Sequence, residues 1–489
     1  MADVETVSLS ERRLKGPSLP TRLAFGFGGV AEGIKNNGFE YFLLFFYSQI
    51  LGVPAPMVFF ALMLALVVDA LSDPVVGYWS DNLRTRIGRR HPFMYAALLP
   101  VTLTYYLAWN PPAGLSSDGL FVWLLVMTIA VRLSFTLYEV PSTALVPELT
   151  SEYDARTGLM SFRYFFAWVG GLSIQVLLLF FLLKPSEQNP SGYFHLPGWH
   201  LYGQVAAAVI LLAGAVSSFG THARIPYLKA PPPQRSLTLG KVFAEIFETI
   251  SNPSFRALFL ATLFGLLASG VSASLNQYIN GYFWGFTTTQ TAGLTMAVYI
   301  SAVLALIVAP VAGRLMGKKR AALTIGVLAF TIAPAPVFAR LLGLMPPNGS
   351  DALYSIVLSV TIVDLALIIA TQMLMGSMVA DIVEDSEVQT GRRSEGVFYA
   401  GISFIRKLAQ ASGVFVATLV LTLAGIREGA TPDQVSGDAL TSLGWGYAVT
   451  LLAAWTLMLL CVSFYRISRE SHEANLQQLR ERHETGPNP

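Results

Sequence analysis

The sequence contains twelve apolar stretches, each about as long as a helix that crosses a lipid bilayer. A membrane-spanning helix needs about 20 mostly apolar residues. The stretches lie at residues 23–51, 57–80, 93–109, 119–147, 157–184, 200–222, 255–283, 290–316, 321–343, 351–380, 396–427 and 441–466. This pattern predicts an all-α membrane protein with twelve transmembrane helices.

The composition agrees with this prediction and excludes several other classes of protein. Of the 489 residues, 53% are hydrophobic and 13% are charged, whereas about 25% are charged in soluble domains. The net charge of +2 is too small to indicate a nucleic-acid partner. The single cysteine, Cys461, excludes a disulfide framework.

Motifs of enzymes and of ATP-driven pumps are missing from the sequence. It contains no Walker loop, no HExxH and no GxSxG. None of its six histidines falls in the middle of an apolar stretch, which argues against a haem or metal site within the bilayer. We therefore expect no enzyme, no cofactor and no metal beyond a coupling ion.

The distribution of basic residues predicts the orientation in the membrane. Loops on the cytoplasmic side carry an excess of Lys and Arg. An even number of spans places both termini on one side, and 23 of the 32 Lys and Arg residues lie in the tails and loops of that side. The loops of the other side contain only Lys184, Arg340 and Arg427. We therefore expect a multi-pass plasma-membrane protein, of a bacterial inner membrane, with both termini in the cytoplasm.

A polar segment at 223–254 divides the twelve stretches into two groups of six. We predict an N-terminal half at 1–222, a cytoplasmic central loop at 223–254, a C-terminal half at 255–466 and a tail at 467–489. A weak repeat supports the halves, because a glycine and a basic run follow the second stretch of each (Gly77 with 84–90, Gly313 with 314–320). Such halves are typical of secondary transporters, whose substrate site lies between them. The alternative is that short basic loops only satisfy the positive-inside rule.

Two carboxylates in the second stretch predict a cation site. Asp69 and Asp73 are four residues apart, so they share one face of a helix. Two carboxylates this close in a low dielectric do not both stay charged unless a proton or a cation is bound. Hard cations such as Na⁺ prefer oxygen ligands, and Ser72 adds one oxygen. The alternative is that nearby arginines neutralise the pair.

The fourth and fifth stretches carry further ionisable residues. Arg132, Thr136 and Glu139 share one side of the fourth stretch, and Arg163 lies in the fifth. A charged group at the centre of a membrane helix costs at least about 2.5 kcal/mol, so it faces a cavity or a partner. Glu139 and Arg163 either form a buried pair, which only fixes helix packing, or jointly face a polar ligand.

Polar residues of the first stretch and of the second half complete the candidate substrate site. The first stretch is too polar to face lipid, and amides with aromatic rings suit a neutral polyol by hydrogen bonding and ring stacking. For the lysine in the eleventh stretch, the alternative is a side chain that snorkels to the membrane surface. The candidates are Glu32, Lys35, Asn36, Asn276, Tyr278, Asn280, Gln372 and Lys407.

Acidic residues after the tenth stretch predict a gate at the cytoplasmic surface. Asp381, Glu384 and Asp385 follow position 380. We expect them to pair with the arginines of the loop after the second stretch and to hold the two halves together. These arginines are Arg84, Arg86, Arg89 and Arg90. The alternative is a solvated run of charges.

Four motifs resemble those of the glycoside–pentoside–hexuronide:cation symporters, a family of the major facilitator superfamily. They are Thr21-Arg-Leu-Ala-Phe-Gly-Phe-Gly, Asp69-Ala-Leu-Ser-Asp73-Pro74-x2-Gly77, Tyr138-Glu-Val-Pro141-x3-Leu145-Val146-Pro147, and Ala380-Asp381-Ile-Val-Glu384-Asp385 followed by Glu395-Gly-x-x-Tyr399 and Lys407. The resemblance covers most of the chain. It implies the fold of that superfamily and the symport of a sugar or glycoside with Na⁺ or H⁺ by alternating access.

The resemblance also implies roles for individual residues. Asp69 and Asp73 would bind the coupling ion, with Ser72 and Thr136 as further oxygen donors. Glu139 is similar to a sugar-binding acidic position, Arg163 to a cavity arginine and Lys407 to a lysine near the cation site. The implied partners are a small-molecule substrate and the lipid bilayer, without nucleic acid, and we expect the monomer to function.

The sequence departs from the family's galactoside permease in two places. It has Glu32-Gly33 where that protein has a Lys-Asp pair, and Thr143 where it has a tryptophan. The sugar-contacting carboxylate and a stacking ring are therefore missing, which leaves the sugar open. A related animal branch carries lysolipids with sodium, so an amphipathic solute is one alternative, and a membrane sensor that does not transport is another.

Overall fold

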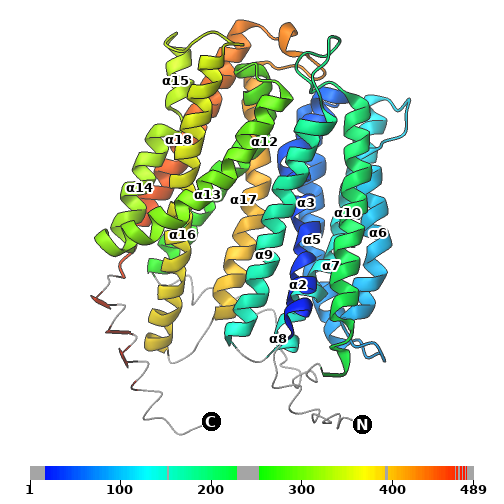
Figure 1. Ribbon diagram of the computed structural model, residues 1–489, viewed down its shortest axis with the longest axis vertical. Coiled ribbons are helices and arrows are strands. Elements are labelled where there is room, and N and C mark those ends of the chain that lie inside the picture. The colour runs from blue at the N-terminus through cyan, green and yellow to red at the C-terminus, as the bar shows by residue number, and fades with distance from the viewer. Residues whose placement is uncertain are drawn as a thin grey trace, which may run out of the picture. The chain divides into compact units, whose positions relative to one another are not determined.

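The computed structural model describes residues 17–150, 153–227, 253–390 and 395–467, and residues 470–471, 474–475, 477–478 and 481 (Figure 1). In this part of the chain the long elements are all helices, and nine of them are long and apolar enough to cross a membrane. The helical segments follow the twelve predicted stretches in the same order.

The first six stretches give the following elements. The first stretch forms a nearly continuous run of five short helical elements, the first two of which meet at Gly28. Each of the second to sixth stretches forms one long helix, some with a short extension. The elements are α2 (Leu19–Phe27), α3 (Gly29–Asn37), η1 (Gly38–Phe42), α4 (Leu43–Phe45), η2 (Phe46–Ile50), α5 (Ala55–Asn82), α6 (His91–Trp109), α7 (Ser117–Ala144), α8 (Val146–Leu149), α9 (Tyr153–Val176), η3 (Leu177–Leu182), α10 (Leu196–His222) and η4 (Ile225–Tyr227).

The second six stretches follow the same plan. The largest difference from the sequence expectation is α16, which continues well past the predicted end at 380. The elements are α12 (Pro253–Tyr278), η5 (Ile279–Phe283), α13 (Thr288–Met316), α14 (Lys318–Ile332), α15 (Ala335–Leu341), α16 (Asp351–Thr390), α17 (Glu395–Ala424), η6 (Pro432–Gln434) and α18 (Gly437–Ser463).

The chain forms two compact units. Unit 1 comprises Met1–Gln234 with the short segments Thr287–Ala292 and Arg427–Thr431. Unit 2 comprises Arg235–Phe286, Gly293–Ile426 and Pro432–Pro489. The boundary between Gln234 and Arg235 lies within the polar segment at 223–254, of which 228–252 lie outside the described residues.

Small residues bring the helices of unit 1 close together. α3 packs along α9, and a Cβ atom on Gly33 would collide with the backbone carbonyl of Ala167. Close backbone contact of this kind is typical of helix interfaces in membranes, where apolar burial alone provides little driving force. The packing of α3 on α9 positions the polar residues of α3 inside unit 1, away from lipid.

Glycine contacts also bring the helices of unit 2 close together. α12 packs along α17, and a Cβ atom on Gly413 would lie 2.8 Å from the Cα atom of Gly270. The rings of Phe330 on α14 and Trp455 on α18 stack with their centroids 4.7 Å apart. In unit 1, the rings of Trp109 on α6 and Trp199 on α10 also stack. Both units are therefore held by glycine contacts and by aromatic packing between neighbouring helices.

The glycine contact between α3 and α9 makes a prediction about stability. Gly33→Ala adds a methyl group that has no room, and overpacking of this kind costs about 1–3 kcal/mol. We expect a lower melting temperature for this variant in detergent micelles. Gly158→Ala is the matched control, because a Cβ atom at Gly158 on α9 meets nothing within 4 Å. It should keep or raise the melting temperature, and equal melting temperatures for the two variants would contradict the close packing.

Candidate functional site

A cluster of oxygen atoms joins α5 to α7 inside unit 1. The Thr136 hydroxyl oxygen lies 3.1 Å from Asp69 Oδ1 and 3.1 Å from Asp73 Oδ1. Ser72 Oγ lies 3.4 Å from the same hydroxyl and 3.1 Å from the carbonyl oxygen of Asp69, to which it donates. Asp69 and Thr136 are buried.

The hydrogen-bonding capacity of Thr136 limits what this cluster does. A hydroxyl carries one proton, so it donates to one acceptor at a time. With both aspartates ionised, Thr136 would satisfy only one of them and would bring an oxygen lone pair against the other. A bound proton on one carboxyl, or a cation among the oxygens, removes this conflict. The geometry therefore suits a proton or a hard cation such as Na⁺.

Arg132 is a neighbour of this cluster. Its Nη1 atom lies 3.6 Å from Asp69 Oδ2, and both side chains are about nine-tenths buried. The guanidinium group also lies over the ring of Phe39, 5.5 Å from the centroid. The spacing of Arg132 and Thr136, four residues apart on α7, was the sequence signal for this contact, although the sequence did not identify which aspartate Arg132 meets.

A second group of charges lies on α3, α7 and α9. Lys35 Nζ donates to Glu139 Oε2 at 3.0 Å and lies over the ring of Phe135, 4.9 Å from its centroid. Arg163 Nε lies 3.4 Å from Glu32 Oε2, and Arg163 Nη1 donates to Ser142 Oγ at 2.8 Å. Glu139 and Arg163 therefore do not pair with each other. Glu139 on α7 pairs with Lys35 of α3, and Arg163 on α9 pairs with Glu32 of α3.

The exposure of the four side chains is uneven. Lys35 and Arg163 have 9% and 3% of their side-chain surface exposed, whereas Glu139 and Glu32 have 35% and 24%. The two carboxylates therefore keep part of their surface available for hydrogen bonds from a ligand. Asn36, which follows Lys35 on α3, is partly exposed.

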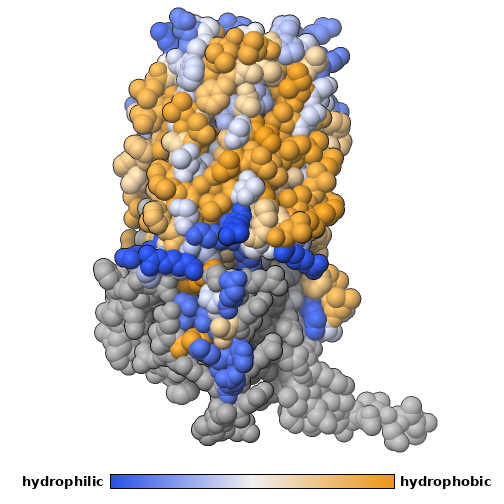
Figure 2. All heavy atoms as spheres, turned by 90° about the vertical axis from the view of Figure 1, so that its left-hand side faces the viewer, coloured by the Kyte–Doolittle hydropathy of each residue, from blue (hydrophilic) through white to orange (hydrophobic). Residues whose placement is uncertain are grey.

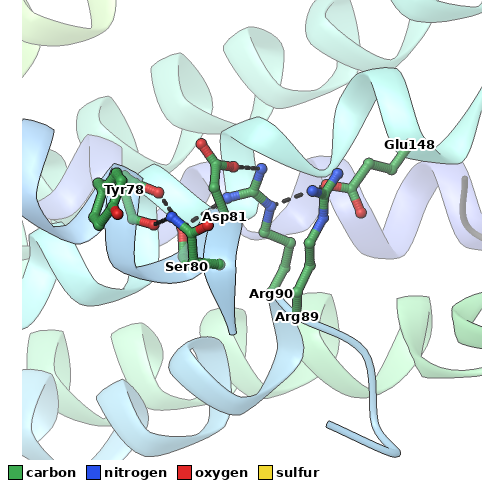
Figure 3. Close-up of polar contacts among 8 residues, drawn as sticks. Tyr78, Ser80, Asp81, Arg89, Arg90 and Glu148 are labelled. Carbon is green, nitrogen blue, oxygen red and sulfur yellow. Dashed lines mark hydrogen bonds and ion pairs between the residues drawn. The ribbon is translucent and has the colours of Figure 1, made fainter. Parts of the chain in front are cut away.

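A third network connects the end of α5, the following loop and α8 (Figure 3). Glu148 Oε1 accepts contacts from Arg89 Nη2 at 2.8 Å and from Arg90 Nε at 2.9 Å. Arg90 also pairs with Asp81 and donates to Ser80 Oγ at 2.6 Å. The sequence did not predict a role for Glu148. The proximity of Asp81 to the arginines that follow it in the sequence was the available signal for the Asp81–Arg90 pair.

Four of the predicted gate residues have partners within their own unit, namely Arg89, Arg90, Asp381 and Asp385. Arg84 and Arg86 are exposed. In unit 2, Lys318 Nζ donates to Asp381 Oδ1 at 2.6 Å, and Asp385 Oδ1 accepts from Asn475 Nδ2 at 3.0 Å. The side chain of Glu384 lies outside the described residues. A pairing of the arginines with the acidic residues of α16 joins two units and stays a prediction.

Two of the polar candidates of unit 2, Asn276 and Asn280, contact each other on α12 and η5. Asn276 Oδ1 accepts from Gln277 Nε2 at 3.1 Å and from Asn280 Nδ2 at 3.2 Å. Tyr278 is fully buried, and Gln372 on α16 is exposed. The side chain of Lys407 lies outside the described residues.

Transition-metal sites have a different chemistry from these clusters. Among the described residues, no group of three or more His, Cys, Asp and Glu side chains comes together in a way that would hold such an ion. The oxygen cluster on α5 and α7, with two carboxylates and two hydroxyls, is instead the kind of site that alkali cations and protons use.

Comparison with known proteins places these features in context. A family model described as MFS/sugar transport protein matches residues 24–469. An uncharacterized symporter of Synechocystis sp. is 28% identical over 97% of this chain and 98% of its own length. The isoprimeverose transporter of Lactiplantibacillus pentosus is 22% identical over 92% and 88%, and the sphingosine-1-phosphate transporter of Mus musculus is 26% identical over 86% and 84%.

Solved structures share the fold at lower sequence identity. The crystal structure of a bacterial homologue of the iron transporter ferroportin, in an inward-facing state, has a TM-score of 0.61 and is 13% identical. The match covers 91% of this chain and 100% of that chain. At this identity the comparison shows a common fold only.

The Lys35–Glu139 pair makes a prediction about stability. Glu139→Gln leaves a buried ammonium group without its carboxylate, whereas Lys35→Met leaves a carboxylate that reaches solvent. We therefore expect Glu139→Gln to destabilise unit 1 more than Lys35→Met. The double variant should recover part of the loss, with a coupling of about 0.5–3 kcal/mol, measured by denaturant titration in mixed micelles. Strictly additive losses would show that the two charges do not interact.

Proposed function

The chain belongs to the family of MFS/sugar transport proteins, and on this basis we propose that it carries a sugar or a glycoside across a membrane together with a cation. Family membership confirms the predicted fold class and the expectation of a membrane transporter rather than an enzyme. Secondary transporters of this fold work by alternating access to a site near the bilayer midplane. The cation and the substrate class are the proposed parts.

The observation that carries the proposal is the position of the Thr136 hydroxyl, 3.1 Å from a carboxylate oxygen of both Asp69 and Asp73. We assign the coupling ion, Na⁺ or H⁺, to these three residues and Ser72. An ion there compensates negative charge that the bilayer makes costly. Arg132, whose Nη1 atom lies 3.6 Å from Asp69 Oδ2, would help to hold this carboxylate in position beside the ion.

The proposed substrate site in unit 1 contains Glu32, Lys35, Asn36, Glu139 and Arg163. Its partly exposed carboxylates would accept hydrogen bonds from sugar hydroxyls, while Lys35 and Arg163 hold them in place. Asn276, Tyr278, Asn280, Gln372 and Lys407 are the proposed contributors from unit 2.

Coupling between ion and sugar would pass along α7. Thr136, which touches the ion site, and Glu139, in the substrate site, are three residues apart and so lie on adjacent turns of one helix. An ion that draws Thr136 toward α5 would shift Glu139 as well. Reciprocity requires that each ligand raise the affinity of the other by the same factor.

An amphipathic solute is the second candidate substrate. The mouse relative is named a sphingosine-1-phosphate transporter and is 26% identical to this chain. A phosphate-bearing solute would need cations. Lys35 and Arg163 are the cations of the proposed site, and each is paired with a carboxylate. This pairing favours the neutral sugar.

The membrane placement follows the charge distribution of the sequence. We propose that both termini face the cytoplasm and that the protein resides in a bacterial inner membrane, with the monomer as the functional unit. The segments at 1–222 and 255–466 are the proposed six-helix halves, joined by the loop at 223–254 and followed by the tail at 467–489.

The ion site predicts the effect of Asp73→Asn. The variant removes one carboxylate from the cluster, so an ion gradient should no longer drive solute accumulation in proteoliposomes, with uptake at least about tenfold lower. Asp118→Asn is the matched control, because Asp118 lies on the same helix as Thr136 but in its exposed first turn. It should transport as the wild type does. Gradient-driven accumulation at the wild-type level in Asp73→Asn would refute the assignment.

The substrate class predicts the outcome of a thermal-shift screen. The purified protein is heated with sugars, glucuronides or lysolipids, each with and without Na⁺. We expect a sugar or glycoside to raise the melting temperature, and by more when the coupling ion is present, because binding to the folded state stabilises it. Stabilisation by lysolipids alone would favour the amphipathic substrate. A Na⁺-independent shift that grows at low pH would identify H⁺ as the ion.

A further inference from the structure

Unit 2 contains a cavity of about 1190 Å³ at the end where α13 stops and α14 begins. The wall is built from the end of α13, the beginning of α14, the part of α16 at 373–381 and the segment that follows α18. Gly317, with φ of +77°, makes the sharp turn between α13 and α14 that opens the wall. Among the residues whose side chains the structure describes, none of those assigned to ion or sugar binding lines this cavity.

The charges that line the cavity are predominantly positive. Five basic residues face two acidic ones, Asp381 and Glu470. Lys318 is paired with Asp381 at 2.6 Å. In the described part of the chain, the side chains of the other four basic residues form neither an ion pair nor a hydrogen bond. These four are Arg314, Lys319, Arg320 and Arg466.

The backbone of α14 adds to the positive potential. The first turn of α14 begins at Lys318, and no side chain caps its amide groups. Uncapped amides at a helix N-terminus attract anions, both by hydrogen bonding and through the helix dipole. Here they lie between basic side chains from α13 and from the segment after α18, so the amides and the cations share one cavity.

Apolar side chains form the rim of the same cavity. Leu315, Met316 and Phe464 line it and have 78%, 39% and 61% of their surface exposed. Figure 2 shows this side of unit 2 as an apolar belt with hydrophilic residues along its lower border. The cavity therefore lies where the apolar surface of unit 2 meets its charged end, which is the depth at which lipid headgroups lie.

From this combination we propose that the cavity binds an anionic membrane phospholipid. Its phosphate group is held by Arg314, Arg320 and the amides of α14, and its acyl chains lie against Leu315 and Phe464. Basic cavities between membrane helices bind acidic lipid headgroups in this way. The lipid connects α13, α14 and the segment after α18, and so stabilises one end of unit 2.

The size and the rim of the cavity favour a lipid over a free phosphate ion. Pockets for small molecules typically have volumes of about 300–1,000 Å³, and inorganic phosphate would occupy a small part of this one. A soluble anion also gains nothing from the exposed apolar rim, whereas acyl chains cover it. The positive-inside rule alone explains basic loops but not basic side chains that converge on a cavity.

Lipid binding to the purified full-length protein tests the proposal. The probes are dioleoylphosphatidylglycerol, which is anionic, and dioleoylphosphatidylcholine, which has the same acyl chains and no net charge, with affinities measured by native mass spectrometry. We expect tighter binding of the anionic lipid. Arg314→Gln/Arg320→Gln should weaken it by roughly 30-fold, from about 1 kcal/mol per basic residue.

Arg84→Gln/Arg86→Gln is the matched control. It removes the same two charges from exposed arginines that do not line the cavity, and it should leave the affinity unchanged. Arg314→Lys/Arg320→Lys keeps the charge and should keep most of the binding, which guards against misfolding of the glutamine variant. Equal affinity for the two lipids, or equal loss in both glutamine variants, would overturn the proposal. So would displacement of the lipid by inorganic phosphate or glycerol 3-phosphate.

Discussion

The cost of placing charge in a bilayer is the constraint on which the rest of unit 1 depends. Its helices carry ionisable residues deep within apolar segments, and each of them is expensive unless a partner or a bound ion compensates it. Glu32 and Glu139 are compensated by Arg163 and Lys35. Asp69 and Asp73 both contact the hydroxyl of Thr136, and Arg132 lies 3.6 Å from Asp69. In the proposed mechanism, a cation bound beside Asp69 and Asp73 would compensate their negative charge.

Helix α7 links these charges because one of its faces meets three neighbouring helices. Thr136 touches the aspartates of α5, Glu139 pairs with Lys35 of α3, and Ser142 accepts from Arg163 of α9. The three positions lie three residues apart in succession, so they occupy adjacent turns. In the proposed mechanism, a change in charge at α5 would reach the Lys35–Glu139 pair through about one turn of α7. In the proposed mechanism, this short path would couple the ion to the substrate in unit 1.

Much of the fold was predictable, because each span must bury about 20 apolar residues whatever its neighbours are. The partners of each charge were less predictable. The spacing of Asp69 and Asp73 placed them on one face, but the choice between Lys35 and Arg163 as the partner of Glu139 depends on which helix packs beside α7. That choice is made by contacts such as Gly33 against Ala167, which no periodicity reveals. Glu148 was missed because it lies on the short helix α8, outside the apolar pattern.

The two basic loops that mark the weak internal repeat differ in what their charges do. In unit 1, Arg89 and Arg90 are satisfied by Glu148 and Asp81, so this loop acts as a structural clamp between α5 and α8. In unit 2, the corresponding loop has one pair, Lys318 with Asp381, while Arg314, Lys319 and Arg320 line a cavity. In the described part of the chain, no acidic side chain forms an ion pair with Arg314, Lys319 or Arg320, although Asp381 and Glu470 also line the cavity. We propose that a negatively charged lipid neutralises the basic residues of the second loop, as Glu148 neutralises those of the first.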